Sequence, residues 1–115
     1  MTQKEFENII DIDNICLIFY IVEMCGKIFF VGDYIDDEEE LKEFYQELVD
    51  TGEIDEEDEI EADVTFYQIG NGDFDSTYAD EEQLQLIQEN WDIAEEYTTV
   101  LSSGRITFEG TFYDG

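Results

Sequence analysis

One run of apolar residues, 15–24 (ICLIFYIVEM), constrains the fold of this chain more than any other segment. It is rich in β-branched and aromatic residues, which favour strands, and it is too short to span a bilayer. Alternate side chains of a strand point to opposite faces, so a strand that is apolar at consecutive positions is covered on both faces. The run therefore predicts a central strand inside a sheet.

The next segments predict a hairpin and a helix. Cys25-Gly26 separates the apolar run from residues 27–34 (KIFFVGDY), and a two-residue break between strands is typical of a tight β-hairpin. Asp36, followed three residues later by Glu39, predicts a capping box at the start of a helix that ends near Gly52. Its apolar stripe consists of Leu41, Phe44, Tyr45 and Leu48.

In the second half of the chain an apolar strand followed by a capped acidic helix occurs again. Residues 62–69 (ADVTFYQI) predict a third strand, Asp80 with Gln83 predicts a second capped helix, and residues 105–113 (RITFEGTFY) predict a last strand. The apolar stripe of the second helix consists of Leu84, Ile87, Trp91 and Ala94. We predict a single acidic α+β domain over residues 1–115, with a small antiparallel sheet of about four strands and two amphipathic acidic helices on one face.

The charge of the chain points to a binding function. Against 33 Asp and Glu stand 4 Lys and Arg and no His, for a net charge of -29, so almost no carboxylate can have a cationic partner. A net charge of about 2 to 8 is enough for solubility, and a larger excess destabilises the compact state by self-repulsion. The 43% of hydrophobic residues nevertheless predict a folded core. We interpret the charge as a surface that another molecule uses.

Catalysis is not expected. Without His there is no imidazole base and no common zinc site, and no pair of carboxylates is distinguished from the others. Gly70-Asn71-Gly72 lacks the lysine of a phosphate-binding loop. We predict that the chain is not an enzyme and needs no cofactor. The amino-terminal residues have no basic leader, and an anionic membrane would repel this surface, so we expect a cytoplasmic protein, in the host cell if phage encoded.

Calcium binding remains an alternative. Asn71, Asp73, Asp75, Thr77 and Glu82 occupy positions 1, 3, 5, 7 and 12 of a twelve-residue loop. The sixth position is a serine, where an EF-hand loop needs glycine, and the preceding segment is predicted as a strand rather than a helix. We therefore predict no specific metal site.

The acidic residues form two groups. The first acidic field contains Glu38, Glu39, Glu43, Glu47, Asp50, Asp55, Glu56, Glu57, Asp58 and Glu59, and Glu40 extends it. The second acidic field contains Asp80, Glu81, Glu82, Glu89, Asp92, Glu95 and Glu96. Within the first field, Glu39, Glu43 and Glu47 recur every four residues, about 6 Å apart on a helix. The 29 net charges equal those on about 49 Å, or about 14 base pairs, of duplex DNA.

Two stretches of the chain resemble the ArdA antirestriction proteins. One passes from Gly26-Lys27 through an aromatic strand to residues 36–41 (DDEEEL), and the other from residues 61–67 through Tyr78 to residues 80–84 (DEEQL). Together they cover less than half of the chain. Members of that family have three small lobes, imitate bent DNA and occupy the DNA groove of restriction-modification enzymes. The resemblance implies a DNA mimic.

The sequence thus predicts a DNA-mimic inhibitor that occupies the DNA-binding channel of a host defence enzyme. The expected partner is a basic DNA-binding protein, either a restriction-modification enzyme or an RNA-guided nuclease, and we expect no direct binding of nucleic acid or membrane. An immunity protein for a basic nuclease toxin is the main alternative, and calcium binding and an ordinary solvated acidic surface are the others. A homodimer is left open.

Overall fold

The computed structural model describes residues 1–35, 37–72 and 76–110. Along the chain lie α1 (Gln3–Ile10), β1 (Leu17–Met24), β2 (Lys27–Val31), α2 (Glu38–Asp50), β3 (Glu59–Ile69), β4 (Thr77–Tyr78), α3 (Glu81–Glu89), α4 (Trp91–Ala94), the 3-10 helix η1 (Glu95–Tyr97) and β5 (Thr98–Glu109). The fold is α+β, as predicted.

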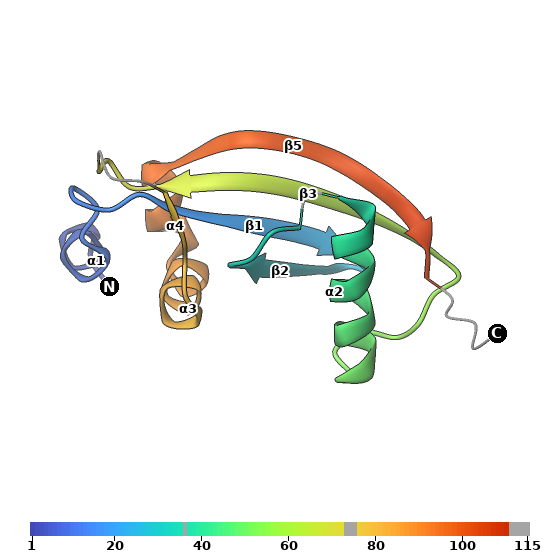
Figure 1. Cartoon of the computed structure of the whole chain (residues 1–115). Coiled ribbons are helices and arrows are strands. Elements are labelled where there is room, and N and C mark those ends of the chain that lie inside the picture. Colours follow the sequence, from blue (N-terminus) through green and yellow to red (C-terminus); the bar gives the residue numbers. More distant parts are fainter. Residues whose placement is uncertain (36, 73–75, 111–115) are drawn as a thin grey trace.

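The strands form one long sheet in the order β2-β1-β3-β5, with antiparallel neighbours. The two-residue β4 adds a parallel pairing to the start of β1, at Leu17 and Ile18. Strand β1 lies inside the sheet, as its apolar run predicts, and β5 forms an outer edge (Figure 1). The molecule is elongated, with principal dimensions of 52 × 26 × 18 Å.

The predicted hairpin between β1 and β2 is confirmed. Met24 pairs with Lys27, so Cys25 and Gly26 alone form the turn. Both have a positive φ, 54° and 73°, as a type I′ turn requires, and the twist of that turn matches the twist of the strands. Glycine supplies the second left-handed conformation at little cost.

Two hydrophobic clusters lie on opposite faces of the sheet. Tyr20, Val22 and Met24 of β1 pack with α2, whereas the alternating residues Leu17 and Phe19 pack with the α1 and α3–α4 segments. The α2 cluster comprises Tyr20, Val22, Met24, Ile35, Leu41, Tyr45, Leu48, Ile54, Ile60, Ala62, Val64 and Phe108. The α3 cluster comprises Phe6, Ile10, Ile12, Leu17, Phe19, Ile69, Ala79, Ile87 and Ala94.

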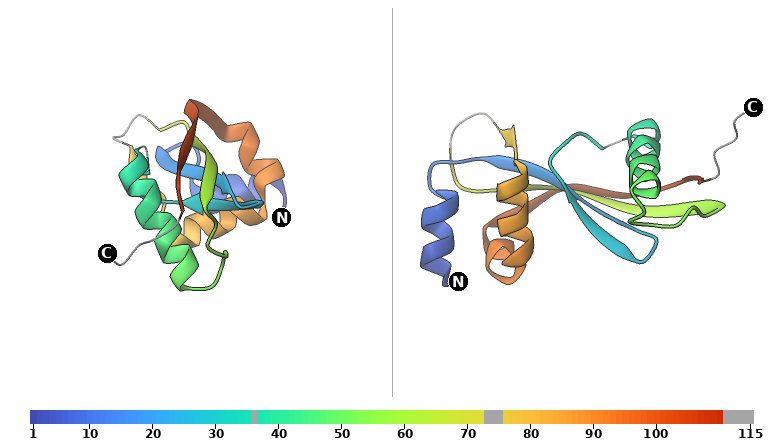
Figure 2. Two further views of the ribbon diagram at one scale, coloured as in Figure 1. Left: turned by 90° about the vertical axis from the view of Figure 1, so that its right-hand side faces the viewer. Right: turned by 90° about the horizontal axis from the view of Figure 1, so that it is seen from below.

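This arrangement differs from the expected placement of both helices on one face. Seen along the strands, α2 lies to one side of them and the α3–α4 segment to the other (Figure 2). The reason lies in β1, which is apolar on both faces and thus gives each helix a surface of its own.

Several element boundaries differ from the expected ones: β2 ends at Val31 rather than at residue 34, and β3 begins at Glu59 rather than at residue 62. The N-cap of α2 is Asp37, whereas the expected cap, Asp36, lies outside the described residues; the expected Asp80–Gln83 capping box is confirmed at α3. The second helix is interrupted at Asn90, whose side chain donates a hydrogen bond to the Leu86 carbonyl over 2.9 Å. Strand β5 starts seven residues earlier than the expected residue 105, because pairing with β3 extends through its Ser-Ser-Gly segment.

Candidate functional site

The exposed side of α2 carries the row of glutamates that the sequence predicts. Leu41, Tyr45 and Leu48 are buried in the α2 cluster, and this orientation leaves Glu39, Glu43 and Glu47 exposed on the other side of the helix. Like charges four residues apart destabilise a helix by a few tenths of a kcal/mol each. The row therefore costs stability, and its presence needs another explanation.

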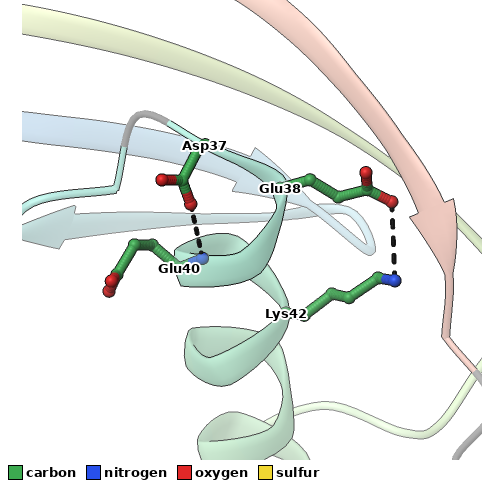
Figure 3. Close-up of polar contacts among 4 residues, drawn as sticks. All are labelled: Asp37, Glu38, Glu40 and Lys42. Carbon is green, nitrogen blue, oxygen red and sulfur yellow. Dashed lines mark hydrogen bonds and ion pairs between the residues drawn. The ribbon is translucent and has the colours of Figure 1, made fainter.

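The start of α2 is fixed by hydrogen bonding rather than by charge neutralisation. The Asp37 carboxylate accepts a hydrogen bond from the Glu40 backbone N–H over 2.8 Å, and Glu38 pairs with Lys42 at 3.5 Å (Figure 3). Both members of that ion pair are exposed, so the pair contributes little stability. The Glu40 side chain points away from Lys42 (Figure 3).

The acidic loop between α2 and β3 is anchored by buried groups. The Tyr45 hydroxyl, on a side chain with 0% exposure, accepts a hydrogen bond from the Glu57 backbone N–H over 2.8 Å. The Gly110 N–H donates to the Asp58 carbonyl over 3.0 Å, and a Cβ at Gly110 would lie 2.1 Å from the Glu57 carbonyl oxygen. The backbone is thus held in place while the side chains of residues 55–59 stay exposed.

Glu40 is the one described acid that is partly buried. Its pKa is raised, first by loss of solvation and then by the surrounding carboxylates Glu43, Asp37, Asp33 and Glu39. It lines a cleft of about 250 Å³ together with Asp33, Tyr34, Glu43, Phe44 and Glu47 among others. The sequence places Glu40 in the first acidic field but does not reveal Asp33 or this cleft, because only the folded β2–α2 connection brings Asp33 against the helix.

Replacing Glu40 with glutamine is expected to raise the melting temperature at pH 7. The raised pKa means that the folded state binds the proton more tightly than the unfolded state, so ionisation of Glu40 at neutral pH destabilises the fold. The gain should shrink as the pH falls through 4.5, the ordinary glutamate value, because the wild-type carboxyl is then protonated. Thermal unfolding followed by circular dichroism at several pH values measures this.

Glu61→Gln is the matched control for that variant. It removes the same charge from an exposed position on β3, opposite Thr107 and near Arg105. We expect no gain in melting temperature from it. Equal gains from the two variants would show that net charge, and not the cluster around Glu40, sets the effect.

The second acidic field lies at the other end of the molecule (Figure 1). Asp80 is the N-cap of α3, and the remaining members follow on α3, α4 and η1, all of them exposed. The α3 cluster packs on the opposite sheet face from α2. The structure therefore keeps the two fields apart rather than joining them into one patch.

A further set of acids lies on the sheet, and of its members only Glu59 belongs to a predicted field. Glu23 on β1 stands directly opposite Asp63 on β3, and Glu59 stands opposite Glu109 on β5. Such like-charge pairs are unfavourable in a sheet. Asp63 is also paired with Arg105 at 2.9 Å, which raises the pKa of the guanidinium. Only long-range strand register creates these pairs, so local patterns could not reveal them.

Charge neutralisation is sparse throughout the described part of the chain. Every described Asp and Glu except Glu40 is exposed, and the two ion pairs there are Lys42–Glu38 and Arg105–Asp63. Lys27 donates to the backbone carbonyl of Glu53. The carboxylates thus stand in solvent, where a cationic partner can reach them.

Of the alternative calcium loop, Asp73 and Asp75 lie outside the described residues. Asn71, which the loop would include, donates its backbone N–H to the Ile12 carbonyl over 2.7 Å. Within residues 1–35, 37–72 and 76–110, no three acidic or cysteine side chains are grouped closely enough to hold a metal ion. Over the same residues, no helix has both the length and the apolar character of a membrane span.

Comparison with known proteins identifies no relative. No protein-family model, curated protein or solved structure matches this chain.

Proposed function

We propose that this protein inhibits a DNA-binding enzyme by imitating duplex DNA. The single observation that carries the proposal is the density of charge along the long axis. The net charge of -29 over 52 Å corresponds to about 1.8 Å per charge. Four acids lie outside the described residues, at positions 36, 73, 75 and 114, and without them the net charge is -25 and the spacing about 2.1 Å. Duplex DNA carries one charge per about 1.7 Å.

The length of the molecule supports the same proposal. At about 3.4 Å per base pair, 52 Å corresponds to about 15 base pairs. A basic channel that binds a duplex of that length would contact a similar number of negative charges on this protein. Carboxylates then substitute for phosphates, and the attraction between opposite charges speeds the encounter.

The partner under this proposal is a basic DNA-binding protein, such as a restriction-modification enzyme or an RNA-guided nuclease. If a phage or plasmid encodes the chain, the two proteins would meet in a bacterial cytoplasm. Both kinds of enzyme bind DNA through Arg and Lys side chains, so both fit the same surface. The acidic loop and the α2 row, which are held by α2 and Tyr45, are the parts we assign to phosphate imitation. The resemblance to ArdA proteins in sequence agrees with this assignment.

The proposal is tested by capture and competition. The immobilised protein is exposed to a bacterial lysate at low salt, and retained proteins are eluted with a salt gradient, purified and titrated with a labelled 15-base-pair duplex. We expect the retained enzymes to bind the duplex and the acidic protein in mutual competition. Affinity for the acidic protein should fall about 10³-fold between about 50 and 200 mM salt, the loss expected for about six contacts of the kind that basic side chains make with phosphates.

Two outcomes would contradict the proposal. Retention of one basic protein that the duplex cannot displace would support an immunity function. Retention of proteins that do not bind DNA at all would remove the basis for mimicry. A lysate protein counts as support only after its purified form passes the competition test.

A further inference from the structure

A cleft of about 440 Å³ lies on the sheet face that carries the α3 cluster. On this face of β1, Leu17 and Phe19 are buried, whereas Ile21 is half-buried and Glu23 is exposed. The helical segment therefore covers only the first part of the strand, and the cleft lies where this cover ends. Its volume is in the range of pockets that bind ligands. The lining includes Ile21, Glu23, Phe30, Asp63, Tyr67 and Trp91.

The strand register arranges the lining of the cleft in successive rows. Ile21 of β1 pairs with Phe30 of β2, which gives an apolar row. In the row two residues further along β1, Glu23 stands between Ile28 of β2 and Asp63 of β3. Directly paired residues share one face of a sheet. The cleft therefore has an aromatic end and a carboxylate end.

The aromatic end presents rings in two orientations. Phe30 and Tyr67 each lie nearly parallel to the buried Phe19, at interplanar angles of 13° and 17°. The ring of Trp91 stands nearly perpendicular to both, with its centroid 5.5 Å from that of Phe30 and 5.6 Å from that of Tyr67. All three cleft rings are half-buried, so part of each lies in solvent. The face of an aromatic ring attracts a cation.

The carboxylate end has one acid without a cation. Asp63 pairs with Arg105 at 2.9 Å, and Arg105 belongs to β5 rather than to the lining of the cleft. Glu23 forms no ion pair within residues 1–35, 37–72 and 76–110. A neutral apolar group that covered the cleft would remove water from Glu23 without replacing its hydrogen bonds, which costs free energy. The charge of the cleft therefore favours a cationic occupant.

We propose that this cleft binds an arginine side chain of a partner protein. A guanidinium is planar and weakly hydrated, so it stacks on aromatic rings, and it donates two parallel hydrogen bonds to a carboxylate. The cleft offers the rings and the Glu23 carboxylate within one cavity. The apolar stem of the arginine can pack on Ile28, which is 56% exposed. A lysine ammonium is compact and strongly hydrated, so it fits such rings less well.

The proposal names one contact with a partner, and it does not require that the partner bind DNA. The purified full chain is titrated with the peptide acetyl-Gly-Ser-Arg-Ser-Gly-amide, and binding is followed by the fluorescence of Trp91, the one tryptophan of the chain. The titration is done at about 150 mM salt, where exposed charges more than about 8 Å apart are largely screened. We expect saturable binding with a dissociation constant of about 1 mM.

Two further peptides test the chemistry of the occupant. The peptide with lysine in place of arginine carries the same charge and should bind at least about fivefold more weakly, because an ammonium does not stack. The peptide with citrulline has nearly the shape of arginine without its charge and should bind at least about tenfold more weakly, because its hydrogen bonds to a carboxylate are not charge-assisted.

A variant pair tests the location of binding. Glu23→Gln should weaken binding of the arginine peptide about fivefold, because it removes the carboxylate of the cleft. Its matched control, Glu61→Gln, removes the same charge from β3 on the same sheet face, two residues from Asp63 and outside the lining of the cleft. The control should change the affinity less than about twofold. Both glutamates are exposed, so both variants should fold, which circular dichroism verifies.

The proposal is overturned if the fluorescence does not saturate with arginine peptide at about 20 times the expected dissociation constant. Equal affinity for the lysine peptide would mean attraction to the acidic surface in general, and equal affinity for the citrulline peptide would mean apolar packing alone. Equal losses from Glu23→Gln and Glu61→Gln would place the peptide outside the cleft. Each of these results contradicts the proposal and leaves the competition test of the proposed function unaffected.

Discussion

Reversing the α2 row, in the triple variant Glu39→Lys/Glu43→Lys/Glu47→Lys, is expected to weaken binding to the proposed target, a DNA-binding enzyme, about a thousandfold. Each reversal replaces an attraction to a basic side chain with a repulsion, and about tenfold per contact is a moderate effect for close charge pairs. The fold should survive, because the three side chains are exposed and two of the new lysines lie three residues from a remaining carboxylate, Glu40 or Asp50. Titration of the enzyme with each variant, in competition with a labelled duplex, gives the affinities.

The control for this triple variant must carry the same net charge. Glu5→Lys/Asp13→Lys/Glu61→Lys also changes the net charge from -29 to -23 and alters exposed positions outside both acidic fields. Its loss of affinity measures the long-range part of the attraction, and we expect that loss to be at most about tenfold. If both triple variants lose affinity equally, binding depends on net charge alone and the α2 row is not a contact surface.

Replacing Phe19 with alanine is expected to lower the free energy of unfolding by about 3 to 5 kcal/mol, the usual cost of such a cavity. Phe19 is fully buried, with its ring stacked on Tyr67 at 5.5 Å and on Phe30 at 6.1 Å, and with Trp91 edge-on at 6.4 Å. The sheet and the second helical segment meet at this side chain. A domain of this size has about 5 to 15 kcal/mol of stability in total, so much of the protein should unfold in mild urea.

Urea denaturation at a fixed salt concentration measures this loss, because salt itself changes the repulsion among the carboxylates. Ile28→Ala on the neighbouring strand is the control, since Ile28 is 56% exposed and should cost about 0.5 kcal/mol or less. A loss below about 1 kcal/mol for the Phe19 variant would mean that the α3 cluster contributes little to the cooperative fold.

Local patterns predicted the elements of this fold well. The apolar run of β1, the Cys25-Gly26 turn and the Asp80–Gln83 capping box each specify structure over a few neighbouring residues, and each is confirmed. The exposed row on α2 follows from the same helical periodicity. Short stretches of sequence were therefore sufficient to predict the α+β fold class.

The remaining features depend on residues far apart in the chain. The apolar run of β1 does not say which helix covers which face, and the Ser-Ser-Gly segment of β5 has the composition of a loop until pairing with β3 makes it a strand. The cluster around Glu40 and the pairing of Glu23 with Asp63 likewise need the folded connections between elements. Charge composition located the acidic helices and Glu59, but not the other acids of the sheet.

The placement of the two helical segments on opposite faces has a consequence for the geometry of a complex. A flat cationic wall can meet one acidic field only, since the other field faces away from it (Figure 2). A tunnel, or two jaws that close, can meet both at once. If both fields contribute to affinity, the protein should bind most tightly to enzymes that encircle their substrate. Enzymes that contact their substrate from one side only should be inhibited much less.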